Sequence, residues 1–328
     1  MISLFRSYNP VNVLWLALWL VVLRVFYMLV APGNVEFVFI ESFARKLVPV
    51  NYEHALNFSV NVLLAGMLVL VQAMLINYLV NHYNLLSKPT FLPALMYITL
   101  ASLYTPFLTL SPPLICNFLV IWMLSKILAF YKGADIKAKA YDLGMIAALG
   151  SVIYFPFIYF VLAIWIAFII FRPFDWRDWA ASILGYATIF FFLAVFYYLN
   201  DHLHDFFKIW DPLGTRLPER ITLNYYKYLL LIPVVLIIVL GMFKLQGTFF
   251  RSSIMVRKVF QLLFFIFLIG GLSFYVKPTF HLEHFLLCAV PLAIFFAFYF
   301  VSATTRWFYE SLYFLLVAGI IYFQFNTF

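Results

Sequence analysis

The chain has 328 residues, of which 66% are hydrophobic and 10% are charged, whereas a soluble globular domain has roughly 45–50% apolar and 25% charged residues. This composition would give a soluble protein an apolar surface, so it excludes a soluble enzyme, a secreted disulfide scaffold, a disordered chain and a nucleic-acid-binding domain. The net charge of +8 is explained by membrane topology and anionic lipid headgroups, because most Lys and Arg lie between apolar runs. We therefore predict one integral membrane domain, residues 1–328.

Ten apolar runs approach the length of about 20 residues that a helix needs to cross a membrane. The first is expected to be a retained span and not a signal peptide, because Arg24 interrupts it and no good cleavage site follows. A shorter run, 141–153, is expected to form a helix of its own, because Gly150 and Pro156 favour a break after it. The ten predicted spans are 11–31, 56–80, 91–110, 113–131, 154–171, 179–198, 226–244, 259–276, 283–302 and 307–325.

The distribution of basic residues favours eleven membrane elements over ten. With the N-terminus inside and 141–153 as a separate element, 13 of the 21 Lys and Arg residues lie inside and 7 outside, with Arg24 in the membrane. Merging 141–153 with the next span weakens this bias to 11 against 9, so the positive-inside rule favours the separate helix. The prediction is an all-α polytopic bundle in the cell inner membrane, with its C-terminus outside and outside loops at 32–55 and 199–225.

Arg24 is an intramembrane charge near the middle of the first predicted span. A charge at this depth costs at least about 2.5–3.5 kcal/mol, so the side chain is expected to face the bundle or a wet cavity. Two interpretations stay open: an anion-binding site, or a structural role through an ion pair or through snorkelling along a tilted helix.

Glu36 and Glu41 follow the first span in the predicted outside loop 32–55. Glu36 lies at the membrane surface among apolar neighbours, which could raise its pKa toward the range useful for a general base. Both are candidate catalytic residues, and the alternative is that they are solvated loop carboxylates.

Two histidine clusters lie at outside ends of predicted spans. Asp201-His-Leu-His-Asp205 opens the loop 199–225, and His281-Leu-Glu-His284 opens the tenth predicted span, where an i, i+3 pair shares one helical face. Histidine and aspartate together could bind a metal or relay a proton. Neither spacing is a specific zinc or di-iron signature, so no dedicated metal site is predicted. The two cysteines are too few and too isolated for a zinc site or a disulfide framework, and no cofactor is predicted.

A basic segment precedes the span at 226–244 and could meet a lipid headgroup. Arg216 and Arg220 lie late in the loop 199–225, and the planar donors of arginine suit phosphate. Lys277 and the histidines at 281 and 284 are predicted at the same depth and complete a candidate lipid-phosphate site. The alternative is a surface loop beside an aromatic belt.

Two sequence segments resemble those of a family of uncharacterised polytopic inner-membrane proteins of Bacteroidota. They are Arg172-Pro-Phe-Asp-Trp-Arg-Asp-Trp179 and Leu4-Phe-Arg-Ser-Tyr-Asn-Pro10, and the general layout of the chain is similar too. This resemblance covers most of the chain and implies no activity.

A remote resemblance connects the layout to the C-type membrane glycosyltransferases, which use polyprenyl-phosphate-linked sugar donors. That class has an acidic residue just after its first span, where Glu36 and, less closely, Glu41 lie. The usual acid is Asp, often paired, and no large outside acceptor domain follows here. The class also has a short helix hairpin after its fourth span, similar to 141–153 followed by 154–171. Its last-helix pattern, where the lipid phosphate is held, is similar to residues 281–293.

Our leading hypothesis is a glycosyltransferase that acts at the outer face of the inner membrane on a lipid-phosphate-linked sugar. Glu36 would be the general base or a metal-orienting carboxylate, while Arg216, Arg220, Lys277 and His284 would hold the donor phosphate. These groups are expected to enclose one polar cavity at the outside ends of the first, eighth and tenth elements. A non-enzymatic component (a transporter, a lipid-handling scaffold or an envelope-machine subunit) and a His-ligated iron oxygenase are the alternatives. Membrane lipid is the expected partner, and nucleic acid is not.

Overall fold

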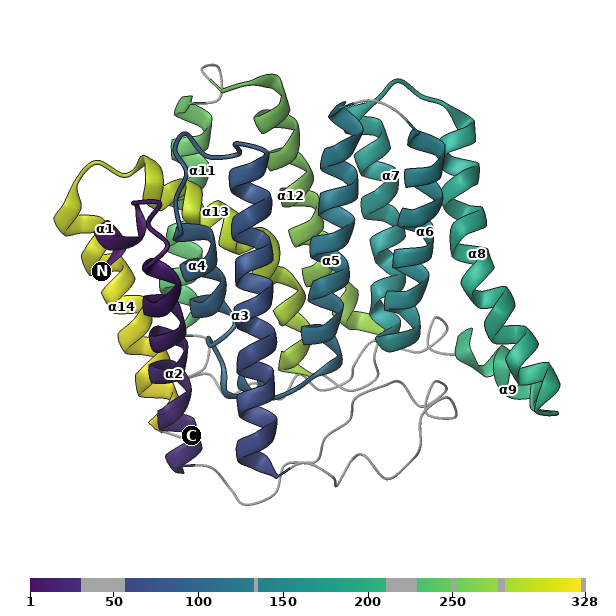
Figure 1. Cartoon of the computed structure of the whole chain (residues 1–328), viewed down its shortest axis with the longest axis horizontal. Coiled ribbons are helices and arrows are strands. Elements are labelled where there is room, and N and C mark those ends of the chain that lie inside the picture. The colour runs from purple at the N-terminus through teal and green to yellow at the C-terminus, as the bar shows by residue number, and fades with distance from the viewer. Residues whose placement is uncertain (31–56, 133–134, 211–228, 249–251, 277–280, 326–328) are drawn as a thin grey trace.

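The computed structural model describes residues 1–30, 57–132, 135–210, 229–248, 252–276 and 281–325 (Figure 1). Within these ranges the chain forms helices and no strand. The all-α class predicted from the sequence is confirmed.

The helices follow one another along the chain with short 3₁₀ segments, labelled η, at several of their ends. The α-helices are α1 (Ile2–Phe5), α2 (Asn12–Val30), α3 (Phe58–His82), α4 (Leu92–Leu100), α5 (Pro112–Leu128), α6 (Ile136–Ile153), α7 (Phe160–Phe171), α8 (Trp176–Leu199), α9 (Leu203–Phe207), α11 (Leu231–Thr248), α12 (Ile254–Leu272), α13 (Ala289–Ser302) and α14 (Arg306–Phe325). The 3₁₀ segments are η3 (Thr105–Leu108), η4 (Ala129–Lys132), η5 (Phe155–Tyr159), η8 (Ser273–Val276) and η9 (Leu282–Cys288).

Five helical stretches in the described ranges are long and apolar enough to cross a membrane. Nineteen residues or more, at 1.5 Å per residue, match a hydrocarbon core of about 30 Å. The chain is therefore a membrane protein. The five stretches are Phe58–His82, Trp176–Leu199, Ile254–Val276, Leu282–Ser302 and Arg306–Gln324, and shorter apolar helices cover Asn12–Val25, Pro112–Leu128, Phe155–Phe171 and Leu231–Gly247.

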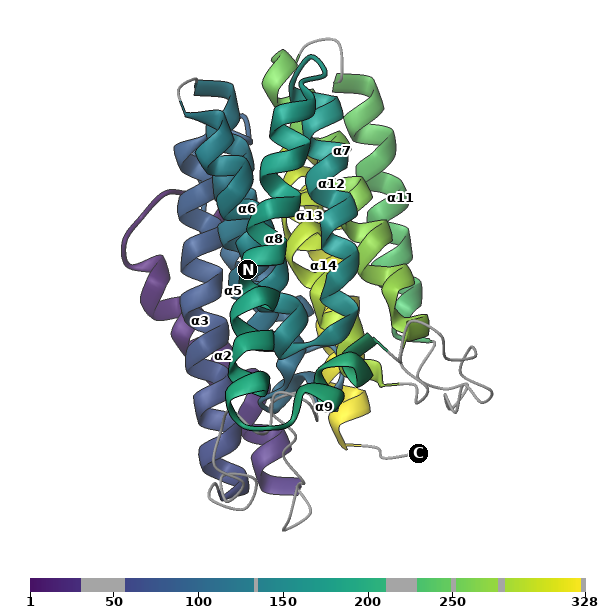
Figure 2. The same ribbon diagram turned by 90° about the vertical axis from the view of Figure 1, so that its right-hand side faces the viewer.

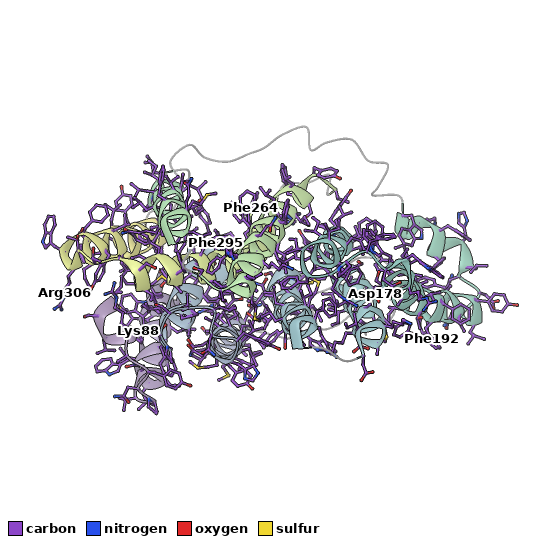
Figure 3. The ribbon with its side chains drawn as sticks, turned by 90° about the horizontal axis from the view of Figure 1, so that it is seen from above. Lys88, Asp178, Phe192, Phe264, Phe295 and Arg306 are labelled. Carbon is purple, nitrogen blue, oxygen red and sulfur yellow. The ribbon has the colours of Figure 1, made fainter. Side chains whose placement is uncertain are left out.

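The bundle is elongated, with α8 at one edge and α2 and α14 at the other (Figures 1 and 2). Large apolar side chains cover its outside. Phe192 of α8 is 64% exposed, whereas Phe295 of α13 is 9% exposed and lies in the interior (Figure 3). An apolar exterior around an apolar interior is what a bilayer demands of a membrane protein, because lipid and not water surrounds it.

The run at 141–153 forms a helix separate from the one that follows, as expected. Tyr154 ends α6 in an extended conformation, and Pro156 then opens η5. The helix is longer than predicted, because it begins at Ile136, five residues before the predicted run.

Among the spans predicted as regular helices, those at 91–110 and 283–302 contain 3₁₀ segments. The run at 91–110 ends as an α-helix at Leu100 and resumes as η3, whose second residue is Pro106. Because proline restricts the residue before it and lacks a donor, the α-helix does not continue through this position. The run at 283–302 begins as η9 and becomes regular only at Ala289.

Helices α6 and α8 pack backbone to backbone through two glycines. A Cβ atom on Gly144 would lie 1.9 Å from the carbonyl oxygen of Ser182, and one on Gly185 would lie 2.1 Å from that of Tyr141. Small residues allow this approach, which gives van der Waals contact where no hydrophobic force drives helices together in a bilayer. The pair therefore depends on the absence of both side chains.

The centre of the bundle is the segment formed by η9 and α13. In the span Leu282–Ser302, 16 of the 21 residues are buried, and every residue from Ala289 to Phe300 is buried. Helices α4, α5, α11 and α12 surround it. The buried polar side chain of η9, His284, therefore has to find its partners inside the protein.

Candidate functional site

Five of the predicted site residues lie outside the described residues, and three lie within them. Glu36, Glu41, Arg216, Arg220 and Lys277 belong to the first group. Arg24, His281 and His284 belong to the second, so the described part of the site is built from α2 and η9.

Arg24 faces the interior of the bundle, as its cost in lipid requires. Its side chain is 3% exposed. Its Nη1 atom donates to the carbonyl oxygens of Leu108, at 2.6 Å, and Val62, at 3.1 Å. Gly66 makes room for it, since a Cβ atom there would lie 3.3 Å from the Arg24 Cδ atom.

The guanidinium of Arg24 keeps donors without partners. Among the described residues, neither Nε nor Nη2 has a hydrogen-bond partner, and no carboxylate forms an ion pair with it. Burial also excludes snorkelling to an interface. A buried cation held only by two carbonyl groups is a site where an anion would be stabilised.

A chain of polar side chains crosses the middle of the bundle. The Tyr97 hydroxyl donates to Gln72 Oε1 at 2.6 Å, and Gln72 Nε2 donates to the Leu114 carbonyl oxygen at 2.6 Å. The Asn117 amide donates to the Tyr97 hydroxyl and to the Leu286 carbonyl oxygen, both at 3.0 Å. All three side chains are buried. The chain therefore fastens α3, α4 and α5 to η9.

His284 is 1% exposed and fastens η9 a second time. Its Nε2 atom lies 2.7 Å from the Gly270 carbonyl oxygen, which only accepts, so Nε2 carries the proton. Its Nδ1 atom then accepts from the Tyr154 hydroxyl at 2.8 Å. Both ring nitrogens are therefore bonded, and they join η9 to α12 and to the residue between α6 and η5.

His281 and His284 do not share one surface, although they are three residues apart. His281 is exposed and precedes the first turn of η9, whereas His284 is buried. In the described residues, no group of three or more His, Cys, Asp and Glu side chains could hold a metal ion. His202 and His204, at α9, are exposed.

An apolar pocket of about 410 Å³ lies beside η9 at the end of the bundle where α11 begins. We call it the η9 pocket. It lies between α4, η3, α11, α12 and α13 as well as η9. Leu103, just before η3, and Phe107, within it, form one wall, and the last residue of η3, Leu108, accepts from Arg24. A polar cavity was predicted at this end, and the described residues form an apolar one there. The lining is Leu100, Leu103, Tyr104, Phe107, Leu231, Val234, Val235, Ile238, Phe267, Gly271, Phe274, Leu282, Phe285, Cys288, Ala289 and Leu292.

The residues that sequence reasoning missed are polar side chains inside apolar runs. Each of them, Gln72, Asn117 and Tyr154, forms a hydrogen bond to another segment of the chain. The available signal was their position, because polar groups in a membrane span are costly and normally face a polar partner. Their partners could not be named, since each bond joins segments far apart in the sequence.

A protein-family model matches residues 35–328 of the chain, and its description is "Family of unknown function (DUF6427)". No curated protein and no solved structure matches the chain. The family match covers about nine-tenths of the length, from the first predicted outside loop to the last residue. This polytopic helical membrane protein therefore belongs to the DUF6427 family.

Proposed function

We propose that this protein handles a long-chain lipid phosphate at the outer face of the cell inner membrane, and that its reaction is the transfer of a sugar from that lipid. The observation that carries the proposal is the η9 pocket. Its volume of about 410 Å³ falls in the range of about 300–1,000 Å³ typical of small-molecule sites. Its lining of aliphatic and aromatic side chains suits a hydrocarbon chain, with a polyprenyl-phosphate-linked sugar as the proposed donor.

A buried cation beside the pocket supports an anionic ligand. Arg24 donates to the carbonyl oxygen of Leu108, the last residue of η3, and η3 carries Phe107 into the pocket wall. Its Nε and Nη2 atoms have no partner among the described residues. In the proposed site, Arg24 favours negative charge at the headgroup end of the pocket, and Arg216, Arg220, Lys277 and His281 are the proposed phosphate contacts.

The proposed chemistry is displacement at a sugar carbon. The acceptor hydroxyl oxygen bonds to the anomeric carbon, the bond from that carbon to the phosphate oxygen breaks, and the lipid phosphate leaves. Glu36 takes the hydroxyl proton, with Glu41 as the second candidate base. His284 acts as a positioning residue, because both of its ring nitrogens already bond protein groups.

The proposed orientation has eleven crossings, with the N-terminus inside. The C-terminal ends of α5, α7 and α11 lie at the same end of the bundle as the N-terminal ends of α6, α8 and α12 (Figure 1). The sequence around these helix ends carries several of the Lys and Arg residues that favour the inside. The η9 pocket, beside the beginning of α11, then faces the outer leaflet.

A topology reporter fused after Phe328 should be active on the periplasmic side. An odd number of crossings puts the two ends on opposite sides, and the basic loops hold the N-terminal side in the cytoplasm. Alkaline phosphatase and green fluorescent protein fusions give opposite readouts and check each other. A cytoplasmic C-terminus would refute the eleven-crossing proposal.

Filling the η9 pocket should abolish lipid binding. Gly271 lines the pocket, and a Cβ atom there meets only Cys288 Sγ, at 3.8 Å, within 4 Å. Gly271→Phe should therefore place a ring in the cavity without a backbone clash. We expect at least a tenfold loss of labelling by a photoactivatable polyprenyl phosphate in nanodiscs. Gly271→Ala, which adds one methyl group, should keep most of it, and equal labelling of the two variants would remove the pocket from the proposal.

The same preparation separates catalysis from binding. With a polyprenyl-phosphate-linked sugar as the probe, Glu36→Gln should keep the labelling but lose sugar release, because the amide cannot accept the hydroxyl proton. Labelling without turnover in the unmodified protein would favour the second candidate, a non-enzymatic lipid-handling component. That candidate is supported by the wholly uncharged lining of the η9 pocket.

A further inference from the structure

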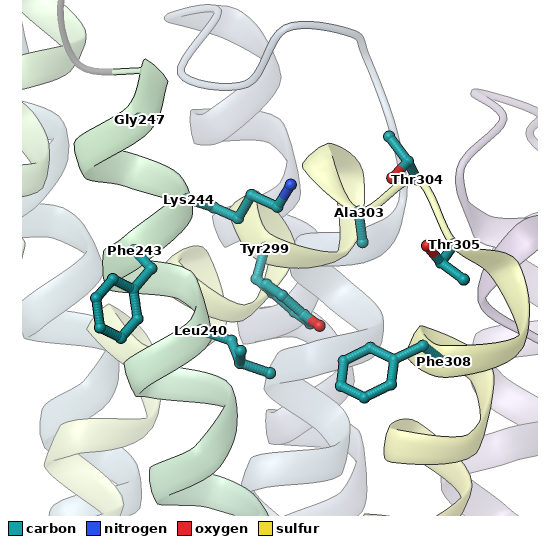
Figure 4. Close-up of a pocket in the computed structure, with 9 residues that line it drawn as sticks. All are labelled: Leu240, Phe243, Lys244, Gly247, Tyr299, Ala303, Thr304, Thr305 and Phe308. Carbon is teal, nitrogen blue, oxygen red and sulfur yellow. The ribbon is translucent and has the colours of Figure 1, made fainter.

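A second pocket lies beside the other half of α11, away from the η9 pocket. It has a volume of about 520 Å³ and lies between α11, the end of α13 and the beginning of α14 (Figure 4). The η9 pocket uses α11 from Leu231 to Ile238, and this one uses it from Leu240 to Gly247. The two sites are therefore independent.

The turn between α13 and α14 forms one wall of this second pocket and is held rigidly. In Figure 1 this turn lies below the C-terminal end of α11, so the last part of α11 extends past the turn. Arg6 donates to the carbonyl oxygens of Phe300, at 3.0 Å, and Ala303, at 2.6 Å. Its guanidinium also lies 4.2 Å from the centre of the Tyr309 ring, a cation–π contact.

The lining combines a cation, hydroxyl groups and an apolar floor. Lys244 reaches from α11 toward the turn that carries Thr304 and Thr305 (Figure 4), and all three side chains are exposed. Below them lie Leu240, Phe243, Tyr299 and Phe308. None of the nine lining residues is acidic. The polar groups thus suit an anion, and the floor suits an apolar group joined to it.

We propose that this second pocket binds the phosphate headgroup of an anionic membrane phospholipid. Lys244 pairs with the phosphate, and the hydroxyl groups of Thr304 and Thr305 donate to its oxygens. A lipid is a better match than a soluble phosphate because Phe243, 68% exposed, extends the pocket onto the outer apolar surface of α11. An acyl chain attached to the phosphate follows that surface.

The test is retention of phosphatidylglycerol by the full chain, measured by native mass spectrometry from nanodiscs containing phosphatidylglycerol and phosphatidylcholine. A lysine near an anionic headgroup contributes enough for about a fivefold effect. Lys244→Gln should therefore reduce phosphatidylglycerol retention about fivefold, and Lys244→Arg should keep it. Lys258→Gln is the matched control, because Lys258 follows on α12 and lies outside the lining. Its retention should equal that of the unmodified protein.

Three outcomes would overturn the proposal. Equal retention by Lys244→Gln and Lys258→Gln would show that the pocket holds no headgroup. Equal retention of phosphatidylcholine and phosphatidylglycerol would show that the charge is not recognised. Displacement of the lipid by millimolar inorganic phosphate would identify a soluble phosphate as the ligand. None of these outcomes bears on the polyprenyl phosphate test, which uses the opposite half of α11.

Discussion

Replacing Gly144 by alanine should separate α6 from α8 and lower the free energy of unfolding by about 3 kcal/mol, the upper part of the usual range for overpacking. The new Cβ atom would lie 1.9 Å from the Ser182 carbonyl oxygen and 2.8 Å from the Tyr186 backbone nitrogen. Both neighbours are backbone atoms, so no side-chain rotation relieves the clash. The measurement is an unfolding titration with sodium dodecyl sulfate in mixed micelles, with thermal melting as a second readout.

Gly185→Ala tests the same contact from α8, and Gly247→Ala is the control. A Cβ atom on Gly185 would lie 2.1 Å from the Tyr141 carbonyl oxygen, so this variant should lose a similar amount. The double variant should lose less than the sum, because one separation of the helices relieves both clashes. A Cβ atom on Gly247 meets nothing within 4 Å, so alanine there should be neutral or slightly stabilising. Equal stability of Gly144→Ala and Gly247→Ala would contradict the backbone contact.

His284→Leu should lower the free energy of unfolding by about 2 kcal/mol, because it removes the buried hydrogen bonds made by both ring nitrogens. The Gly270 carbonyl oxygen loses its donor at 2.7 Å, and the Tyr154 hydroxyl loses its acceptor at 2.8 Å. The same unfolding titration measures the loss. We also expect His284→Leu to bind the polyprenyl phosphate probe more weakly, because Leu282 and Phe285 of η9 line the η9 pocket.

For the unfolding measurement, His281→Leu is the matched control, with the same change three residues away at an exposed site. Its effect on stability should stay within about 0.5 kcal/mol, as for surface substitutions in general. If His284 instead contacts a lipid phosphate directly, His284→Leu would lose probe labelling while its stability stayed unchanged. That result would replace the positioning role with a binding role.

The membrane class and the all-α fold could be predicted from the sequence because both follow from local composition. Long apolar runs must form helices in lipid, where each backbone polar group needs a partner in its own segment. The separate helix at 141–153 was predicted too, from glycine and proline acting on their immediate neighbours. The count of eleven crossings goes beyond the five membrane-spanning stretches that the structure supports, and it stays a prediction.

The interruptions at Leu100 and before Ala289 were missed because hydropathy does not distinguish a regular helix from an irregular apolar segment. Inside a bundle, irregular backbone is tolerated when neighbouring groups satisfy it. The Asn117 amide does this for the Leu286 carbonyl oxygen. Its donor comes from a residue 169 positions away, which no local pattern contains.

In the candidate site, too, some features could be predicted from the sequence and others could not. The burial of Arg24 was predictable, because the cost of a charge in lipid depends only on its depth. Its carbonyl partners at Val62 and Leu108 were not, and neither was the separation of His281 from His284. Glu36, Glu41, Arg216, Arg220 and Lys277 lie outside the described residues and remain predictions.

By itself, the sequence determined that this protein is a helical bundle in a membrane, and that Arg24 is costly there unless it faces the bundle or a wet cavity. These properties depend on each residue and its immediate neighbours in a fixed solvent, the bilayer. Only the tertiary structure decided that η9 is fastened by Asn117 and His284, that α6 and α8 touch at Gly144 and Gly185, and that an apolar pocket lies beside η9. Hydrogen bonds and close packing depend on which distant segments meet, and that is set by the fit of all helices together.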